Sequence, residues 1–436
     1  ICIPIRNSNM IRSKAMPMRH AFGEDERKAV IEVMDYYKNT GDDPPYGGVY
    51  EEAFAEAFEN AMGEGLATPV ATGTGACYYN LPDKGEVILS PVTDSGPLSA
   101  IIALGFTPVI ADAAPGSYNV NRQSIIDCVS DQTVAVFLVH AAGNAVEDIK
   151  QIAEDCKSSN IKLVEDCSQA PFAMARGISP KYVGSFGDIA AFSTMYRKNL
   201  HSGGSGGIVY VTDVHNKDLF NHALAHKDRG KPTWRTDINQ NDPGNALFPA
   251  LNWNTDEFSC AIGSASLKRI EKTIGDRQKF IGHLKEKLDK YSKVCSIDPA
   301  SHSGSSPFYL PIIVDTSLIT VSKTEFAEEV QGRKISLLTH YGCLVSDWEW
   351  ADRYIDWRAS HKYSEGSAPW ASRTPNARAM RDSSFNLFLN ENYTEEEAID
   401  IALAIAWVEE RTLDTKYHEW FGVTFKRTLD HERISF

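Results

Sequence analysis

The chain contains five short, mostly apolar runs that are separated by longer stretches with helical spacing. The runs lie at residues 87–89, 108–110, 133–139, 162–164 and 189–192. Several of them are continuously apolar, and a strand of this kind is buried on both faces, as in a parallel sheet covered by helices. The pattern therefore predicts an α/β fold with a mostly parallel central sheet.

Helices are expected before and after these strands. Apolar spacing predicts a helix at residues 24–37, which ends in the turn-rich segment 39–45, and a second helix at 49–61. Residues 255–291 form a long, charge-rich helical stretch. We interpret this stretch as the bridge from a large domain to a smaller one.

With 436 residues, the chain is long enough for two domains. We predict a large domain at residues 1–285 and a smaller C-terminal α+β domain at residues 286–436. In the smaller domain we expect a strand at 307–314, helices at 322–331 and 394–411, and a loop at 364–372.

Composition restricts the class of function. The chain has 58 acidic and 44 basic residues, a formal net charge of −14, which argues against a nucleic-acid-binding surface. Its eight cysteines are scattered without a CxxC pair or a His/Cys metal spacing, so we predict neither a disulfide scaffold nor a metal site. No signal-peptide pattern and no bilayer-spanning apolar run is evident, so we expect a cytoplasmic protein without a membrane partner.

Two oppositely charged residues follow predicted strands. Asp166 comes just after the strand at 162–164, at the sheet edge where ligands bind in open α/β folds, and Lys198 follows the strand at 189–192. A buried lysine amine loses its proton readily and attacks an aldehyde, while a carboxylate keeps a pyridinium nitrogen protonated. The pair predicts a pyridoxal phosphate (PLP) enzyme. Taken singly, Lys198 would be a surface lysine, and Asp166 a metal ligand, ribose contact or helix cap.

A glycine-containing segment is a candidate for binding the cofactor's phosphate. Residues 71–76 read Ala-Thr-Gly-Thr-Gly-Ala and precede a predicted helix start at 77–79. Small residues let backbone N–H groups approach a phosphate, but taken alone the segment is better explained as an ordinary turn. It matches neither the dinucleotide GxGxxG nor the P-loop pattern. Gln169, three residues after Asp166, is a candidate contact for the phenolic oxygen of PLP.

In this order along the chain, the segments resemble the DegT/StrS-like sugar aminotransferases, a branch of the fold-type I PLP superfamily that includes aspartate aminotransferase. The resemblance runs from about residue 3 to residue 407. The matching elements are Gly73-Thr74, His140-Ala141-Ala142-Gly143, Glu165-Asp166-Cys167-Ser168-Gln169-Ala170, the segment from Gly187 to Ser193, Lys198 five residues later, Leu251-Asn252-Trp253-Asn254, and a helix like that at 258–267.

The resemblance implies a role for each matched residue. Lys198 would be the catalytic Schiff-base lysine and proton shuttle, Asp166 the partner of the pyridinium nitrogen, and Gln169 the contact to O3′. Asn252 would reach the phosphate of the neighbouring subunit's cofactor, which implies a homodimer with shared active sites. The phosphate would be bound within one subunit by Gly73, Thr74, Gly75 and Ser193.

Three departures from the family pattern bear on the substrate. Asp94 stands where the family usually has an aromatic residue stacked on the cofactor ring, and a carboxylate cannot stack in this way. Asn254 stands where an arginine is common, which removes one candidate anion contact. The loop at 203–207 lacks the family's usual glutamate.

Other polar residues lie near the predicted site in the sequence. His201 and His226 are candidates for substrate contact, but a structural or exposed histidine is the favoured interpretation for both. The basic cluster at 227–231 is a candidate phosphate contact, although such charge runs usually lie on solvated faces. The aromatic-rich segment 348–354 is interpreted as domain packing.

We therefore predict a PLP-dependent aminotransferase. By resemblance, it would move an amino group from L-glutamate to a nucleotide-linked or phosphorylated keto sugar in amino-sugar biosynthesis, with a cyclitol ketone as a further possible acceptor. A sugar dehydratase is the first alternative, although the family's dehydratases carry histidine at the position of Lys198. A PLP-binding regulatory protein without turnover is the second, supported by Asp94 and the altered glycine loop.

Overall fold

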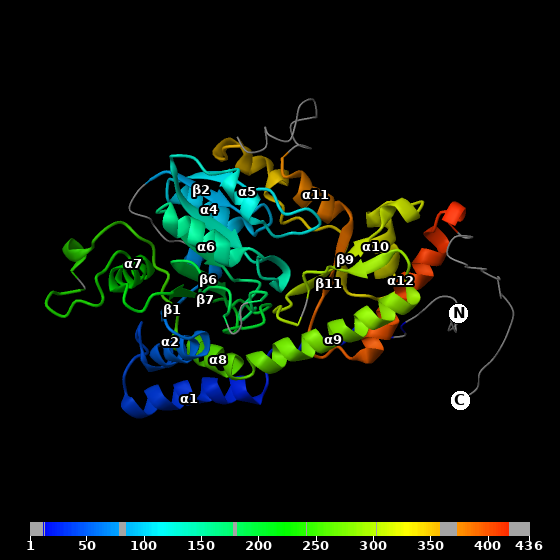
Figure 1. Cartoon of the computed structure of the whole chain (residues 1–436). Helices are drawn as coiled ribbons and strands as arrows, with labels where there is room; N and C mark the ends of the chain where they lie inside the picture. Colours follow the sequence, from blue (N-terminus) through cyan, green and yellow to red (C-terminus); the bar gives the residue numbers. More distant parts are fainter. Residues whose placement is uncertain are drawn as a thin grey trace.

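The computed structural model describes residues 12, 14–77, 84–177, 181–240, 242–301, 303–357 and 373–417. Within these ranges the chain forms a seven-stranded sheet and a four-stranded sheet, each packed against helices (Figure 1). The loop predicted at 364–372 lies outside the described residues, as do residues 78–79 of the predicted helix start.

The larger sheet has the strand order β1-β7-β6-β5-β4-β2-β3. All pairs from β6 to β3 are parallel, and β7 runs antiparallel to both of its neighbours. This topology confirms the predicted α/β fold with a mostly parallel sheet. The strands are β1 (Leu66–Val70), β2 (Glu86–Leu89), β3 (Thr107–Ile110), β4 (Thr133–Val139), β5 (Lys162–Asp166), β6 (Ile189–Ser193) and β7 (Gly207–Val211).

Both edge strands of this sheet contain a proline, Pro69 in β1 and Pro108 in β3. Proline has no N–H to donate, so an edge strand tolerates it where a central strand would not. Strand β1, with the sequence Leu-Ala-Thr-Pro-Val, was missed by sequence reasoning. Strand β7, with the sequence Gly-Ile-Val-Tyr-Val, was also missed, although its continuous apolar run offered a signal.

Helices cover both faces of the larger sheet, which explains its continuously apolar strands (Figure 1). On one face, α5 and α6 pack over β2, β4 and β5, while Phe54 and Phe58 of α2 pack over β6 and β7. On the other face, Leu98 and Ile101 of α4 pack over β2 and β4. The helices are α1 (Glu24–Thr40), α2 (Val49–Met62), α3 (Gly73–Cys77), α4 (Ser95–Ala103), α5 (Arg122–Ile126), α6 (Ile149–Ser158), α7 (Lys217–Lys227) and α8 (Glu257–Lys268).

The helical stretch predicted at 255–291 is two helices, α8 and α9 (Ile270–Tyr291), rather than one. They are separated at Arg269, whose φ of −112° and ψ of 9° depart from helical values. Arginine is a good helix former, so apolar spacing alone gives no sign of a one-residue break. The amino end of α8 is capped by Asp256, whose side chain accepts a hydrogen bond from the Ser259 amide.

The smaller sheet is antiparallel, with the order β10-β11-β9-β8. Helix α9 connects the two parts of the molecule, because Ile270 lies in a core cluster of the larger sheet and Leu284 in that of the smaller one (Figure 1). The strands and helices of this part are β8 (Cys295–Ile297), β9 (Tyr309–Val314), β10 (Leu337–Leu338), β11 (Ser384–Phe388), α10 (Lys323–Gln331), α11 (Pro375–Asp382) and α12 (Glu395–Thr412).

One segment after β10 returns to the larger sheet. Val345 and Ala351 belong to the core cluster over its α4 face, and Trp348 packs against that cluster while stacking on Trp350. These contacts fit the packing interpretation of residues 348–354. The domain division at residue 285 falls inside α9 and stays a proposal. Short 3-10 helices lie at Ala141–Gly143, Pro243–Asn245, Thr316–Leu318, Val345–Asp347, Glu349–Tyr354 and Thr415–Tyr417.

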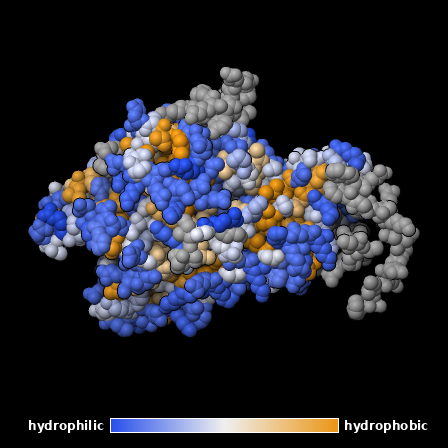
Figure 2. Space-filling model, viewed as in Figure 1, coloured by the Kyte–Doolittle hydropathy of each residue, from blue (hydrophilic) through white to orange (hydrophobic). Residues whose placement is uncertain are grey.

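The surface, the helices and the cysteines bear on the expectations from composition. The face in Figure 2 is mostly hydrophilic, with smaller apolar patches. Within the described ranges, no helix combines the length and the apolar character needed to cross a membrane. The seven cysteines that the structure describes are free thiols, and six of them are buried.

Candidate active site

Lys198 lies in the turn that follows β6, and its Nζ is 4.3 Å from the centroid of the Phe308 ring. Burial lowers the pKa of this amine, while the negative charges of Asp166 and Asp94 oppose the shift. Loss of the proton leaves the neutral amine, which is the nucleophilic form. The environment therefore suits a lysine that reacts with an aldehyde.

Asp166 is the last residue of β5 and is buried. Burial raises the pKa of its carboxyl group, against hydrogen bonds from Ser168 and the positive charge of Lys198. The Ser168 amide donates to Oδ1 at 2.9 Å. Lys198 and Asp166 each influence the other's pKa, so the structure brings together the two residues that were predicted to act as a pair.

Gln169 has a fixed amide orientation. Its Oε1 accepts a hydrogen bond from the Ala142 amide at 2.8 Å, and its Nε2 donates to the Tyr341 hydroxyl at 3.4 Å. Because the carbonyl oxygen is held by the backbone, the amide group donates hydrogen bonds on its other side. Tyr341 was missed by sequence reasoning, since it lies 172 residues from Gln169 and no local pattern links them.

The predicted phosphate-binding residues gather at the start of α3. This helix begins at Gly73, so Thr74 and Gly75 lie in its first turn, and the predicted helix start at 77–79 is wrong. A Cβ on Gly73 would lie 2.6 Å from the Ser193 Cβ, so only glycine permits this approach. The Gly73 backbone and the Ser193 side chain therefore lie together at the start of α3, where the Gly75 amide donates to the Thr72 hydroxyl at 2.8 Å.

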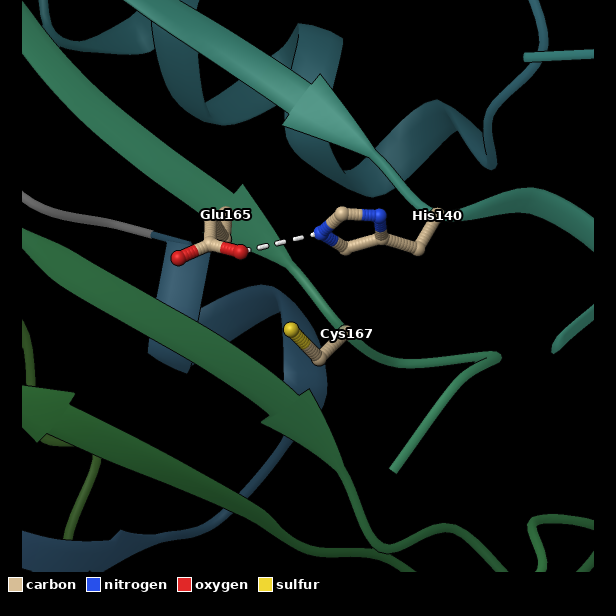
Figure 3. A group of neighbouring side chains, drawn as sticks. All are labelled: His140, Glu165 and Cys167. Carbon is tan, nitrogen blue, oxygen red and sulfur yellow. Dashed lines mark hydrogen bonds and ion pairs between the residues drawn. The ribbon is translucent and has the colours of Figure 1, made fainter. Parts of the chain in front are cut away.

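A second cluster next to the site, His140, Glu165 and Cys167, could in principle hold a metal ion (Figure 3). Glu165, however, already accepts four hydrogen bonds. His140 Nε2 donates at 3.0 Å, while His140 Nδ1 accepts from the Val146 amide at 3.0 Å. The other three donors are the amides of Gly184, Phe186 and Gly187.

These bonds define the chemistry of Glu165. Burial alone would raise the pKa of its carboxyl group, but His140 and the backbone amides outweigh it and the pKa lies below its ordinary value. The Glu165 carboxylate thus hydrogen-bonds both the loop after β5 and His140, which follows β4. Both of its oxygens are already engaged, which fits a structural acid rather than a metal ligand.

The three departures from the family pattern have defined places in the structure. Asp94 is exposed and caps α4, since its Oδ1 accepts from the Gly96 amide at 3.0 Å. Asn254 donates to the Asn252 side chain at 2.9 Å. In the glycine loop, the Ser205 hydroxyl donates to the Ala71 carbonyl at 2.8 Å and so ties this loop to the end of β1.

Asn252 is exposed, and its Nδ2 donates to the Tyr46 hydroxyl at 3.4 Å. The neighbouring Trp253 ring packs against Gly75, where an added Cβ would approach it to 2.9 Å. The turn at 252–253 therefore lies beside the amino end of α3. The structure places Asn252 on the surface next to this end of the site.

The remaining candidates have structural partners. His201 is fully buried and hydrogen-bonds the Ala21 carbonyl, and burial lowers its pKa to about 4. His226 is also buried and packs on Phe248. Lys227 forms an ion pair with Glu51 and is itself buried, against the expectation of a solvated face, whereas Arg229 of the same cluster is exposed.

The model of the DegT/DnrJ/EryC1/StrS aminotransferase family matches residues 22–405. The chain belongs to this family. The match confirms the resemblance that was drawn from the ordered motifs. Together with the similar proteins described next, it also confirms the predicted enzyme class, a PLP-dependent transaminase.

Three similar proteins illustrate how far the likeness extends. An uncharacterized protein of Methanocaldococcus jannaschii is 24% identical over 408 residues, which cover 91% of this chain and 98% of that protein. The GDP-perosamine synthase of Escherichia coli O157:H7 is 29% identical over 255 residues, 56% of this chain and 63% of the synthase.

The third is a solved structure, the Helicobacter pylori aminotransferase PseC, involved in the biosynthesis of pseudoaminic acid. It superposes with a TM-score of 0.76 at 20% identity and covers 92% of this chain and 100% of PseC. At this identity the likeness concerns the fold, and the predicted fold-type I architecture is confirmed.

Proposed function

We propose that this chain is a PLP-dependent aminotransferase that moves an amino group from L-glutamate to a nucleotide-linked or phosphorylated keto sugar in amino-sugar biosynthesis. The observation that carries the proposal is Lys198, a half-buried lysine whose amine lies close enough to the Asp166 carboxylate, at the edge of the larger sheet, for each charge to affect the other's pKa. The names of the sugar-processing relatives support a sugar acceptor.

The residues present suit PLP, which has an aldehyde, a ring nitrogen, a phenolic oxygen and a phosphate. Lys198 suits the aldehyde, Asp166 the ring nitrogen, and the donating side of Gln169 the phenolic oxygen. The first turn of α3 and the Ser193 side chain, which lie together because Gly73 packs closely on Ser193, would hold the phosphate. When bound, PLP would supply an electron sink for the charge that develops at the amino donor's α-carbon.

The protein's own residues would then hold and move protons. The neutral Lys198 amine, once replaced by the donor's amine, takes the α-proton and returns it as general base and acid. Asp166 must be ionised to hold a ring N–H, although burial raises its pKa. A positively charged ring nitrogen would offset that cost, so the cofactor completes an environment that favours the carboxylate.

We also propose a cytoplasmic homodimer in which Asn252 reaches the cofactor phosphate of the neighbouring subunit. The exposed position of Asn252, next to the turn that packs on Gly75, supports this arrangement. Mixing the Lys198→Ala and Asn252→Ala variants tests it. If sites are shared, hybrid dimers regain activity that neither variant has alone. Absence of any regained activity in proven hybrids would contradict it.

The absorption spectrum of the PLP-loaded protein, before and after L-glutamate, tests the function. We expect a visible band that glutamate bleaches as the cofactor takes the amino group. Lys198→Ala should lack the band. Lys181→Ala is the matched control, because Lys181 Nζ also lies over an aromatic ring, 4.4 Å from the Phe186 centroid, but is exposed.

The other outcomes select among the alternatives. A band that glutamate leaves unchanged but L-glutamine bleaches would correct the donor and keep the enzyme class. A band that no amino donor bleaches would favour the regulatory protein without turnover. Loss of oxygen from a keto sugar without net amino transfer would favour the dehydratase. No band at all would contradict the PLP proposal.

A further inference from the structure

The residue after the reactive lysine, Asn199, holds two parts of the chain together. It is 2% exposed, and its Nδ2 donates to the Ser306 hydroxyl at 2.9 Å and to the Ser306 and Pro307 carbonyls at 3.2 Å each. Its Oδ1 accepts from Arg277 Nη1 at 2.5 Å. The lysine turn is therefore joined to residues 304–308, the segment that leads into β9.

Arg277 extends this contact into a network. It is 1% exposed, donates to the Pro307 carbonyl at 3.0 Å, and pairs through Nη2 with Glu391 at 3.0 Å. Glu391 in turn pairs with Arg19 Nε at 3.1 Å, and Arg19 Nη1 donates to the Tyr196 carbonyl at 3.1 Å. The network thus hydrogen-bonds the lysine turn on both sides of Lys198, at residues 196 and 199.

The segment 304–308 is also fixed from its other side. The Ser306 amide donates to the Gly143 carbonyl at 2.8 Å, and the Phe308 amide donates to the Ala142 carbonyl at 3.3 Å. Gly143 has a φ of 90°, and a Cβ there would lie 2.0 Å from the Ser306 carbonyl oxygen. The segment is thereby held between two loops, with the Phe308 ring against the Lys198 amine.

We propose that Asn199, Arg277 and Glu391 are positioning residues that hold the Lys198 turn against residues 304–308 and keep the amine packed on Phe308. A buried ion pair adds little net stability compared with apolar residues of the same size. The charge network surrounds one turn, and this placement is better explained by the geometry that the network maintains than by a gain in stability. The inference rests on the proposed function only for what Lys198 reacts with.

The test uses variants that separate geometry from charge. Asn199→Ala removes the link without changing any charge. Arg277→Met removes both the link and a charge, whereas Arg277→Lys keeps the charge but cannot reproduce the two-sided fork of the guanidinium. Arg12→Gln is the matched control, because Arg12 is also a buried arginine, pairs with Glu397 at 3.2 Å and Asp400 at 2.6 Å, and lies in another network.

Two measurements on the cofactor-free protein report on the positioning. Hydrogen exchange of the peptide that contains Ser306 and Phe308 should become faster by about tenfold or more in Asn199→Ala and Arg277→Met. Competitive acetylation across a pH range should place the titration midpoint of Lys198 higher, because the loosened amine is better solvated. Groups that face Lys198, namely Asp166, Asp94, Cys343 and Cys77, are unchanged in every variant.

Arg277→Lys should give intermediate values, and Arg12→Gln should leave both measurements at the wild-type level. If the Asn199 and Arg277 variants lose stability while exchange and titration stay at the wild-type level, the positioning role is wrong. Glu391→Gln, which keeps an acceptor oxygen, gives the same test if a stronger variant fails to fold. Neither measurement uses PLP, so failure of the proposed function would leave this result readable.

Discussion

Glu165 and Asp166 are neighbours in β5, yet their carboxylates lie in opposite environments. Glu165 accepts four hydrogen bonds from His140 and three backbone amides, and the pKa of its carboxyl group is lowered. Among the described residues, Ser168 is the only hydrogen-bond donor to the Asp166 carboxylate, and the pKa of that carboxyl group is raised. Successive residues of a strand point to opposite faces of a sheet, so one step along the chain separates a structural acid from one available to a ligand.

The number of hydrogen bonds that a buried carboxylate accepts indicates whether it belongs to the fold or to a ligand site. Burial of a carboxylate is unfavourable unless it is paired and hydrogen-bonded. A buried acid whose acceptors are all used contributes to the fold, and one left short of donors has capacity for a ligand. Asp166 meets the second description, and the Lys198 amine lies in the same environment. Four predictions test this distinction between a structural acid and one with capacity for a ligand.

The largest effect is expected for the structural acid. Glu165→Ala should lower the free energy of unfolding by about 3–5 kcal/mol, because it leaves His140 and three buried amides without their acceptor. Asp166→Ala should change it by about 1 kcal/mol or less, since Asp166 makes few favourable contacts. Chemical denaturation of the two variants measures the difference. Equal losses of stability would contradict the distinction.

The ligand-facing acid should show the opposite pattern in catalysis. Asp166→Asn is expected to slow the half-reaction with L-glutamate by about a hundredfold or more, because it removes the charge that complements the ring nitrogen. Stopped-flow absorbance of the PLP-loaded variant measures the rate. Folded Glu165→Gln, compared at equal cofactor occupancy, should stay within about tenfold of the wild type. A rate close to the wild type in Asp166→Asn would remove Asp166 from the mechanism.

The buried His201 should make the stability of the protein depend on pH. Burial, with a smaller effect of the Arg19 charge, lowers the pKa of His201 to about 4. The unfolded state, with a histidine pKa of about 6.5, binds a proton in a pH range where the folded state does not. Stability should therefore fall as the pH drops from about 6.5 to about 4, by at most about 1.4 kcal/mol per pH unit.

His201→Gln should flatten this part of the stability curve. The exposed His215→Gln variant is the control and should leave the slope unchanged. Denaturant unfolding at several pH values gives both slopes. An unaltered slope in His201→Gln would show that other groups account for the acid sensitivity.

The smallest effect concerns the orientation of Gln169. Tyr341→Phe removes a hydroxyl that accepts a long hydrogen bond from Gln169, at 3.4 Å. We expect PLP affinity to fall by the value of one weak hydrogen bond, about 0.5–1.5 kcal/mol, with little loss of stability. Equilibrium dialysis with PLP measures the affinity. A loss as large as that of Asp166→Asn would mean that Tyr341 contacts the cofactor itself.

The pair at the centre of the site could be predicted from the sequence because both residues follow strands whose apolar runs are local signals. The parallel arrangement of β5 and β6 brings Asp166 and the start of the Lys198 turn to the same edge. Pattern and order along the chain were therefore sufficient for Lys198 and Asp166. Their roles in the reaction remain predictions.

Features that depend on distant contacts could not be predicted. Tyr341, which follows β10, contacts Gln169 from 172 residues away in the sequence. Arg277 of α9 contacts Asn199 from 78 residues away. The break at Arg269 lies where that side chain pairs with Glu26 and donates to the Ala21 carbonyl, contacts that no local spacing reveals. Such features come from tertiary packing, which overrides local preference.

The most direct test of the distinction between the two acids is the stabilisation that PLP gives to each variant. At a PLP concentration of about 100 times the wild-type Kd, binding should raise the free energy of unfolding of the wild type by about 2.7 kcal/mol. The account predicts that Glu165→Gln, though less stable, keeps this gain, and that Asp166→Asn loses most of it. A gain that is kept in Asp166→Asn and lost in Glu165→Gln would contradict the account.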